Sequence, residues 1–167
     1  MATIKKVGVI GGGLMGSGIA QVCAAAGLPT VVREMSEELC AKSRQSIEKT
    51  LSKGIERGKV TVDERDKTLG NLRFATKLAD LADSDIFIEA VVEDLTVKNA
   101  LWSELDKIAG KEAIFASNTS SLTIIAMATA SGRPDRMIGL HFFNPVPLMK
   151  LVEVVRTITT SEETERR

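Results

Sequence analysis

The only histidine in the chain, His141, stands where an apolar segment gives way to polar residues, and an acid, Glu153, follows in the aliphatic segment 151–155. If both segments are strands, alternation puts Glu153 on the face opposite to Val152 and Val154, either in a polar pocket or at an edge. A buried carboxylate needs a partner, and an imidazole is one candidate. Together they would form a general base and the group that orients it. Two plainer interpretations stay open, a structural histidine and a solvated edge glutamate.

A second group of residues has the types and spacing for binding phosphate. Gly11, Gly13 and Gly16 follow the apolar run 7–10 and open an apolar helix expected over residues 14–26. The first glycine permits a tight turn, the second lets a pyrophosphate approach the backbone, and the third lets the helix lie close to the sheet. The free N–H groups at the start of the helix attract anions. This context favours a dinucleotide-binding turn over a structural glycine turn.

The acid after the next expected strand indicates which dinucleotide binds. Glu34 ends the segment 30–34, eighteen residues after Gly16, where a carboxylate accepts a hydrogen bond from the ribose 2′-hydroxyl. A carboxylate repels a 2′-phosphate, so NAD is expected rather than NADP. The neighbouring Arg33 weakens this preference, because its charge favours a phosphate.

The elements between these residues alternate between strand and helix. A short strand is expected at 72–75, buried strands at 85–90 and 113–116, and helices at 36–58, 63–69 and 94–110. This order predicts an α/β fold, a Rossmann-type doubly wound, mostly parallel sheet with a helical excursion after the second strand. Ligands bind beyond the carboxyl ends of such strands, so the loops after Ala90, Ala116 and Leu140 are expected to form the site. Trp102 is expected to be half exposed on its helix.

These motifs resemble those of the L-3-hydroxyacyl-CoA dehydrogenases, including the 3-hydroxybutyryl-CoA dehydrogenase branch. The resemblance covers residues 3–160. It rests on the glycine turn 11–16, IEAVVE at 88–93, SNTSS at 117–121, and above all HFFNPVP at 141–147 with KLVEVV at 150–155. It implies NAD-dependent oxidation of L-3-hydroxyacyl-CoA to 3-oxoacyl-CoA, or the reverse. This chain would then supply the cofactor half of the site and a His–Glu catalytic pair.

The resemblance also implies a role for each matching residue. His141 corresponds to the general base that takes the 3-hydroxyl proton, and Glu153 to the acid that orients the imidazole. Ser120 corresponds to the hydroxyl that binds the substrate oxygen, Asn144 to a side chain near the nicotinamide, and Ser43 to a group near the CoA arm. The expected cofactor contacts are Gly11, Gly13, Leu14, Met15, Gly16, Glu34, Ala90, Glu93 and Lys98. Glu34 replaces the more usual aspartate, which lengthens the ribose contact by one methylene.

The same resemblance predicts how the chain is divided. Residues 1–160 are expected to form the NAD-binding domain, and residues 161–167 to begin a helix, with Thr160 and Glu163 as a capping box. In the family this helix leads into an all-helical C-terminal domain that completes the acyl pocket and makes most of the dimer. The chain is therefore expected to be a fragment of a homo-oligomeric protein. A helix of about one turn with nothing to pack on is not expected to be stable.

Composition narrows the remaining classes of partner. Charged residues make up 26% of the chain, with 22 of each sign, which leaves no basic field for nucleic acid or a membrane surface. No apolar run approaches ~20 residues, and the N-terminus enters a strand too early for a signal sequence. Cys23 and Cys40 lack metal-ligand spacing and suit a reducing compartment. We therefore expect a cytoplasmic location and no metal site.

Two other functions are weighed against the dehydrogenase. Enzymes that oxidise free 3-hydroxyacids share the GxGxMG turn but carry a catalytic lysine on a later helix, and nothing here replaces the His141–Glu153 pair with such a lysine. A non-catalytic NAD(H)-binding module is the second alternative. The presence of His141, Glu153 and Ser120 argues against that module, whereas the expected absence of a helical domain argues for it. The acyl-chain length and the direction of the reaction are not indicated by the sequence.

Overall fold

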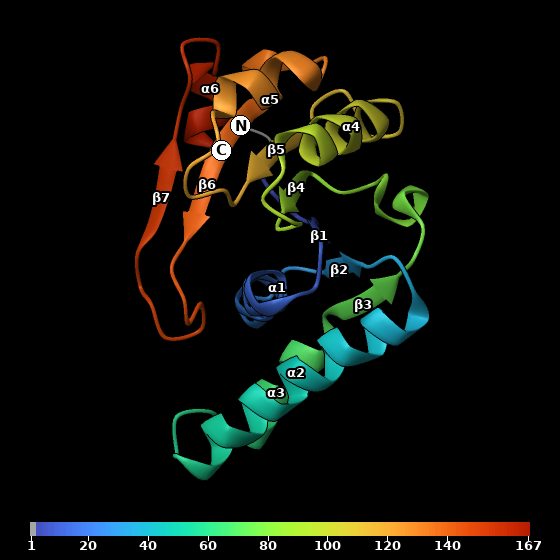
Figure 1. Cartoon of the computed structure of the whole chain (residues 1–167). Helices are drawn as coiled ribbons and strands as arrows, with labels where there is room; N and C mark the ends of the chain where they lie inside the picture. Colours follow the sequence, from blue (N-terminus) through green and yellow to red (C-terminus); the bar gives the residue numbers. More distant parts are fainter. Residues whose placement is uncertain (1–2) are drawn as a thin grey trace.

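The chain folds around one seven-stranded sheet in a computed structural model that describes residues 3–167 (Figure 1). The strands are β1 (Val7–Ile10), β2 (Thr30–Arg33), β3 (Leu72–Ala75), β4 (Ile86–Glu89), β5 (Ile114–Ser117), β6 (Met137–Phe142) and β7 (Val152–Val155). Their order is β3-β2-β1-β4-β5-β6-β7. Strands β1 to β6 run parallel, and β7 runs antiparallel to β6. The order reverses between β1 and β4, where doubly wound sheets bind their ligands.

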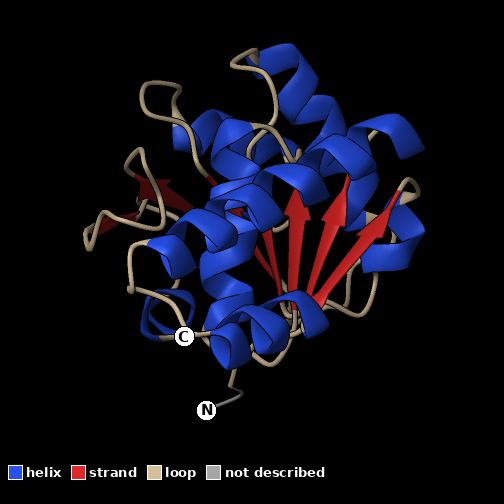
Figure 2. Ribbon diagram, turned by 90° about the horizontal axis from the view of Figure 1, so that it is seen from below, coloured by secondary structure: helices blue, strands red, loops and turns tan. Residues whose placement is uncertain are grey.

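Helices cover both faces of this sheet (Figure 2). They are α1 (Leu14–Ala25), α2 (Glu37–Glu56), α3 (Val62–Gly70), α4 (Leu95–Asp106), α5 (Ile124–Ala130) and α6 (Glu162–Arg166), with 3-10 turns at Leu78–Leu81 and Pro134–Arg136. Helices α2 and α3 form an arm that extends from the body below α1 in Figure 1. The predicted Rossmann-type sheet and the helical excursion after its second strand are thereby confirmed.

The central strands β1, β2, β4 and β5 are largely apolar because both of their faces are buried, whereas the edge strand β7 is exposed along its length. Val9 and Ile88 pack on the face that carries α1, whereas Phe87 and Phe115 pack on the face that carries α4. Parallel strands covered on both sides read as continuous apolar runs for this reason. The expectation for Trp102 is wrong: its side chain is fully buried on α4 and stacks on Phe115, with ring centroids 4.9 Å apart.

One predicted helix end is also wrong. Helix α4 ends at Asp106 rather than at Gly110. The carbonyl of Leu105 accepts hydrogen bonds from the N–H groups of both Ile108, at 3.1 Å, and Ala109, at 2.8 Å. A turn tightened in this way ends the helix before the glycine is reached.

The start of α3 is set by a complete capping box at Thr61. The Thr61 hydroxyl accepts the N–H of Glu64 at 3.2 Å, and the Glu64 carboxylate accepts the N–H of Thr61 at 2.7 Å. Replacing Thr61 by alanine is expected to lower the free energy of unfolding by about 1 kcal/mol, because it removes one of these bonds. Urea denaturation measures this loss. Thr61→Ser keeps the hydroxyl and should retain the stability, so equal losses in both variants would contradict the prediction.

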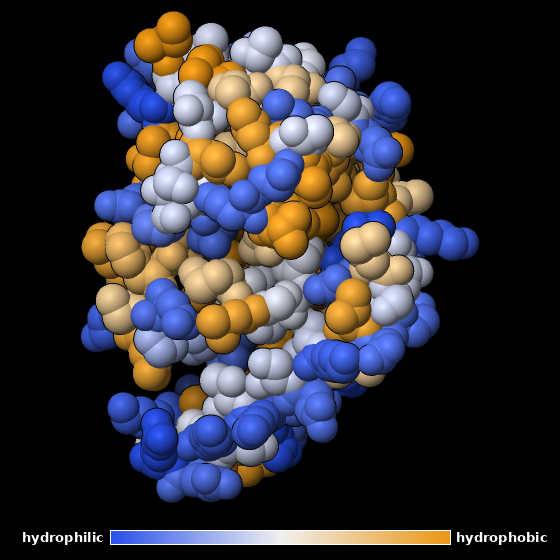
Figure 3. All heavy atoms as spheres, in the orientation of Figure 1, coloured by the Kyte–Doolittle hydropathy of each residue, from blue (hydrophilic) through white to orange (hydrophobic). Residues whose placement is uncertain are grey.

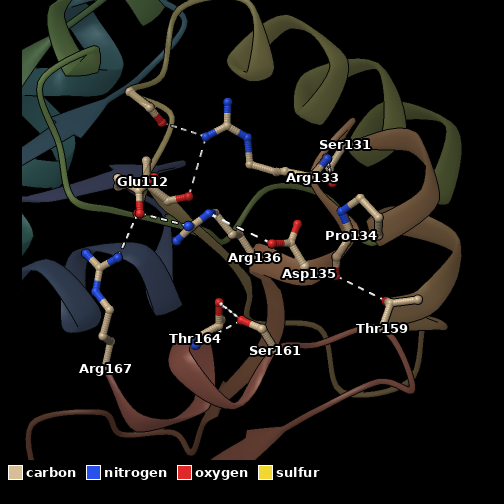
Figure 4. Close-up of polar contacts among 12 residues, drawn as sticks. Glu112, Ser131, Arg133, Pro134, Asp135, Arg136, Thr159, Ser161, Thr164 and Arg167 are labelled. Carbon is tan, nitrogen blue, oxygen red and sulfur yellow. Dashed lines mark hydrogen bonds and ion pairs between the residues drawn. The ribbon is translucent and has the colours of Figure 1, made fainter. Parts of the chain in front are cut away.

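The last helix, α6, is tied to the end of the sheet where β5 and β6 begin (Figure 4). Ser161 caps it by accepting the N–H of Thr164 at 3.2 Å, whereas the hydroxyl of Thr160 donates to the carbonyl of Met137. The capping box expected from Thr160 and Glu163 is therefore wrong by one residue. Arg167 donates to the carbonyl of Glu112 at 2.9 Å. These contacts, and the burial of Thr164, give the short helix the packing that its sequence did not indicate.

Three expectations from the sequence concern a membrane-spanning helix, a metal site and the state of the two cysteines. Within residues 3–167 no helix combines the length and the apolar character that a membrane crossing requires. The same residues contain no cluster of histidine, cysteine, aspartate or glutamate that could hold a metal ion. Cys23 and Cys40 are both free thiols, and burial raises the pKa of Cys23 to about 11. The cytoplasmic location stays a prediction.

Candidate active site

The glycine turn after β1 contains two glycines that the fold itself requires. Gly11 has a φ of +90°, and a Cβ there would lie 2.7 Å from the carbonyl oxygen of Ala90. A Cβ on Gly16 would lie 1.7 Å from the carbonyl oxygen of Gly11. Gly16 is therefore needed for packing within the turn as well as for packing of the helix. Gly13 differs, because a Cβ there would meet no atom within 4 Å. Its lack of a side chain leaves open space beside the backbone.

The first turn of α1 offers free donors beside that open space. Gly13 is the N-cap residue and provides no side-chain cap. Ser17 donates its N–H to the carbonyl of Gly13 at 2.9 Å, so the N–H groups of Leu14 to Gly16 precede the hydrogen bonds of the helix. The Leu14 side chain is exposed. Backbone donors, the positive end of the helix dipole and an unobstructed approach are what a pyrophosphate requires.

Glu34 lies against this turn. One of its carboxylate oxygens accepts the N–H of Gly12 at 2.6 Å, and the other accepts the N–H of Met35 at 3.2 Å. The acid is therefore held at the end of β2 beside the glycines, where the ribose of a dinucleotide would need it. Arg33 donates from Nε to the carbonyl of Thr76 at 3.1 Å. This bond directs its guanidinium toward the loop after β3.

A cavity of about 390 Å³ brings together half of the residues selected from the sequence. Its lining includes Met15, Ala90, Glu93, Lys98, Ser120, His141 and Asn144, together with Val91, Asn118, Phe142 and Phe143. These residues come from α1, from α4, from the end of β6 and from the loops that follow β4, β5 and β6. The carboxyl ends of neighbouring parallel strands meet at one edge of the sheet, which explains why distant segments converge here.

His141 and Glu153 face each other across the antiparallel pair β6–β7. The imidazole Nδ1 lies 2.7 Å from Oε2 of Glu153. Glu153 is on the edge strand with its side chain 51% exposed, and His141 is 22% exposed. In the neutral imidazole whose Nδ1–H donates a hydrogen bond to Glu153, Nε2 keeps a free lone pair. This is the arrangement of a general base with the group that orients it.

Residues 6–167 match the model of the family described as 3-hydroxyacyl-CoA dehydrogenase, NAD binding domain. The chain belongs to this family. The family resemblance, the Rossmann-type fold and NAD as the cofactor are thereby confirmed.

Individual relatives agree with this assignment. The domain is 52% identical over 161 residues to a probable 3-hydroxybutyryl-CoA dehydrogenase of Deinococcus radiodurans, covering 96% of this chain and 58% of that protein. It is 50% identical over 165 residues to the 3-hydroxybutyryl-CoA dehydrogenase of Mycobacterium tuberculosis, covering 98% of this chain and 58% of that protein. The crystal structure of (S)-3-hydroxybutyryl-CoA dehydrogenase PaaH1 from Ralstonia eutropha superposes with a TM-score of 0.96 at 40% identity, covering 98% and 58% of the two chains.

The domain spans little more than half the length of these curated relatives. The activity, substrates and partners of the whole protein are therefore proposals. Assembly into homo-oligomers and the division at residue 160 stay predictions.

One residue selected from the sequence does not join the others. Ser43 of the NAD-binding domain is 2% exposed, and its hydroxyl lies beneath the glycine turn, where a Cβ on Gly12 would come within 2.5 Å. Among residues 3–167 this hydroxyl has no hydrogen-bond partner. A side chain buried in this position offers no surface to the CoA arm of a substrate.

Several residues that position the site were missed in the sequence. Asn118 accepts the N–H of Phe142, the neighbour of His141, through Oδ1 at 2.9 Å, and so joins the loop after β5 to the end of β6. Val146 packs on α1 at Gly18, where a Cβ would lie 2.8 Å from the Cβ of Val146. That contact fixes the loop that carries Asn144. Glu89 is fully buried at the end of β4. A single acid within a buried apolar strand was a signal that could have identified it.

The carboxylate of Glu93 is also held by contacts with neighbouring side chains. Burial would raise its pKa, but hydrogen bonds from Lys98 and Thr119 outweigh burial and hold the pKa below its ordinary value. Folding therefore favours the ionised form of Glu93. Its contribution to stability is present above the ordinary pKa of about 4.5 and is lost as the pH falls through the lower pKa of the folded state.

Acid denaturation tests the direction of this pKa shift and its effect on stability. Glu93→Gln should reduce the loss of stability that the domain suffers between about pH 6 and pH 3.5, because the variant has no carboxylate to protonate at this site. Thermal unfolding followed by circular dichroism at a series of pH values measures the loss. Glu104→Gln, at an exposed residue of α4, serves as the control. An identical pH dependence in all three proteins would contradict the prediction.

Proposed function

We propose that the chain takes part in the NAD-dependent interconversion of L-3-hydroxyacyl-CoA and 3-oxoacyl-CoA, and that it supplies the cofactor half of the site and the catalytic pair. The observation that carries this proposal is the contact of 2.7 Å between His141 and Glu153 at the wall of the cavity that also contains Ser120. Oxidation of a secondary alcohol requires a base near the hydroxyl and a donor to hold its oxygen.

Each residue of the site has one role in the proposed reaction. Nε2 of His141 takes the proton of the 3-hydroxyl, and Glu153 stabilises the imidazolium that forms. Ser120 donates a hydrogen bond to the substrate oxygen while it changes from hydroxyl to carbonyl. NAD⁺, when bound, accepts the hydride that leaves C3. The glycine turn, Glu34, Glu93 and Lys98 would hold the cofactor, and Asn144 would lie near its nicotinamide. In the reverse direction the imidazolium returns its proton to the oxygen.

A second, larger cleft supports an acyl-CoA as the substrate. It has a volume of about 560 Å³ and lies between α1, the far end of α2, α3 and residues 145–148. In Figure 3 it opens at the left, where a notch separates the hydrophilic α2–α3 arm from the body of the molecule. Four cations line it, Lys53, Arg57, Lys59 and Lys67, and apolar residues such as Pro147 and Leu148 line the side nearest the active site. The phosphates and the pantetheine arm of CoA need such a combination.

The direct test is to mix the chain with NADH and acetoacetyl-CoA and to follow the loss of the reduced-nicotinamide absorbance. Turnover is expected. NADH binding without turnover would overturn the catalytic proposal for this chain and would favour the alternative, a non-catalytic NAD(H)-binding module. Fluorescence of bound NADH separates these outcomes from a protein that fails to bind the cofactor.

The cleft has a test of its own. Arg57→Gln is expected to raise the KM for acetoacetyl-CoA and to leave the KM for acetoacetyl-pantetheine, which lacks the nucleotide phosphates, unchanged. Equal effects on the two substrates would show that Arg57 does not contact the phosphates.

A further inference from the structure

The acid Glu89 has a place in the site that the reaction above does not use. It is the last residue of β4, and its side chain is 0% exposed. Its carboxylate accepts three hydrogen bonds, from Lys98 Nζ at 2.9 Å, from the Ser117 hydroxyl at 2.5 Å and from the N–H of Val91 at 2.9 Å. Burying a carboxylate is costly, and an apolar side chain often serves stability as well as a buried ion pair does. Stability is therefore a weak explanation for an acid at this position.

Lys98 connects this acid to the cavity. Its side chain is 1% exposed, and Nζ contacts Glu89 at 2.9 Å and Glu93 at 2.8 Å. An ammonium group has three N–H donors, so two are used by these carboxylates and one is left for the cavity that Lys98 lines. Glu89 and Glu93 together fix the direction of that third donor.

The same three residues set the charge of the cavity wall. Two carboxylates and one ammonium give the cluster Glu89–Lys98–Glu93 a net charge of −1. Glu93 is the part nearest the solvent, with its side chain 43% exposed, and its lowered pKa keeps it ionised at neutral pH. The charge of Lys98 is thus more than offset. A wall of this kind repels phosphate and favours a neutral hydroxyl or a cation.

We propose that Glu89 is a positioning residue: it turns Lys98 from a free cation into an oriented donor, and it gives the cavity the negative charge that favours the cationic nicotinamide of NAD⁺ over the neutral one of NADH. This inference rests on the proposed function, because it takes the cavity to be the place where the cofactor reacts. It adds a residue that discriminates between the two redox states of the cofactor.

Glu89→Gln is the variant that isolates the charge. The amide oxygen can still accept from Lys98 and Val91, and the Ser117 hydroxyl can rotate to accept from the amide NH₂. The shape and the number of hydrogen bonds are kept, and one negative charge is lost. The ratio of the Kd for NAD⁺ to the Kd for NADH is expected to rise by about five- to tenfold, as loss of one charge several ångströms from a cation would cause.

Matched variants separate charge from structure. Glu89→Asp keeps the charge but moves it, so both cofactors should bind more weakly while their ratio stays near that of the unmodified protein. Glu104→Gln, exposed on α4, the helix that carries Lys98, should leave both constants unchanged. If Glu89→Gln fails to fold by circular dichroism, Glu93→Gln makes the same one-charge change in the same cluster at a half-exposed side chain, and the same ratio decides.

The outcome that overturns the inference is a ratio that stays within about twofold of that of the unmodified protein, even if both cofactors bind more weakly. That result would mean that Glu89 serves the structure alone. The measurement is made by titration without substrate, so it is independent of turnover. A chain that binds both cofactors but does not reduce acetoacetyl-CoA would contradict the proposed function while leaving the ratio to decide the role of Glu89.

Discussion

Replacing His141 by alanine is expected to lower kcat for acetoacetyl-CoA reduction by about 10²–10⁴-fold, the usual contribution of a positioned acid–base group. In the direction of reduction the imidazolium donates a proton to the oxygen as hydride arrives at C3, and no other histidine exists in the chain to replace it. Steady-state kinetics with NADH measures the loss.

The affinity for NADH distinguishes this loss from a damaged fold. Because His141 is part of β6 rather than of the glycine turn, NADH should bind to the alanine variant about as tightly as to the unmodified protein. Glu153→Gln keeps a hydrogen-bond acceptor for Nδ1 but removes the charge that stabilises the imidazolium, so it should lower kcat by less than His141→Ala does. An unchanged kcat in His141→Ala would exclude the histidine as the acid–base group.

Replacing Gly13 by alanine is expected to weaken NADH binding by at least about tenfold, equivalent to about 1.4 kcal/mol, without lowering the thermal stability of the protein. The added methyl group meets no protein atom within 4 Å, so the fold has no reason to resist it. It would instead fill the space through which a pyrophosphate approaches the helix N-terminus.

Two other glycines make this test specific. Gly70→Ala also adds a methyl group that meets nothing within 4 Å, at the end of α3, and should leave NADH binding unchanged. Gly16→Ala places a Cβ 1.7 Å from the carbonyl oxygen of Gly11 and should destabilise the fold itself. Fluorescence titration and thermal unfolding measure the two properties separately. Full NADH affinity in Gly13→Ala would contradict binding of the pyrophosphate at this turn.

Much of the fold was predictable because each buried strand is a short apolar run between clear turn residues. The bounds expected for β3 were met without change, at Leu72–Ala75. The errors lie where tertiary contacts decide. Trp102 is buried because Phe115 lies opposite it on the sheet, and α6 is supported by Glu112, more than 50 residues earlier in the chain. Neither contact leaves a local signal in the sequence.

The residues of the site were easier to predict from the sequence than the contacts between them. His141 and Glu153 could be paired as candidates, but only the β6–β7 register places them opposite each other. The burial of Ser43 was not foreseen, because the sequence did not reveal which side of α2 packs beneath the glycine turn. Glu89 was missed although it is a single acid in an apolar strand, and its contact with Lys98 of α4 becomes visible only in the folded chain.

The edge position of β7 makes the assembly of the His141–Glu153 pair a local folding equilibrium. Strand β7 has four residues and pairs only with β6 among the strands of the sheet. Because side chains alternate along a strand, a slip of one residue would turn Glu153 to the opposite face while the rest of the sheet stayed intact. The fraction of molecules with an assembled His141–Glu153 pair would then equal the fraction in which β7 is paired with β6. Amide hydrogen exchange at β7, rather than global unfolding, reports that fraction.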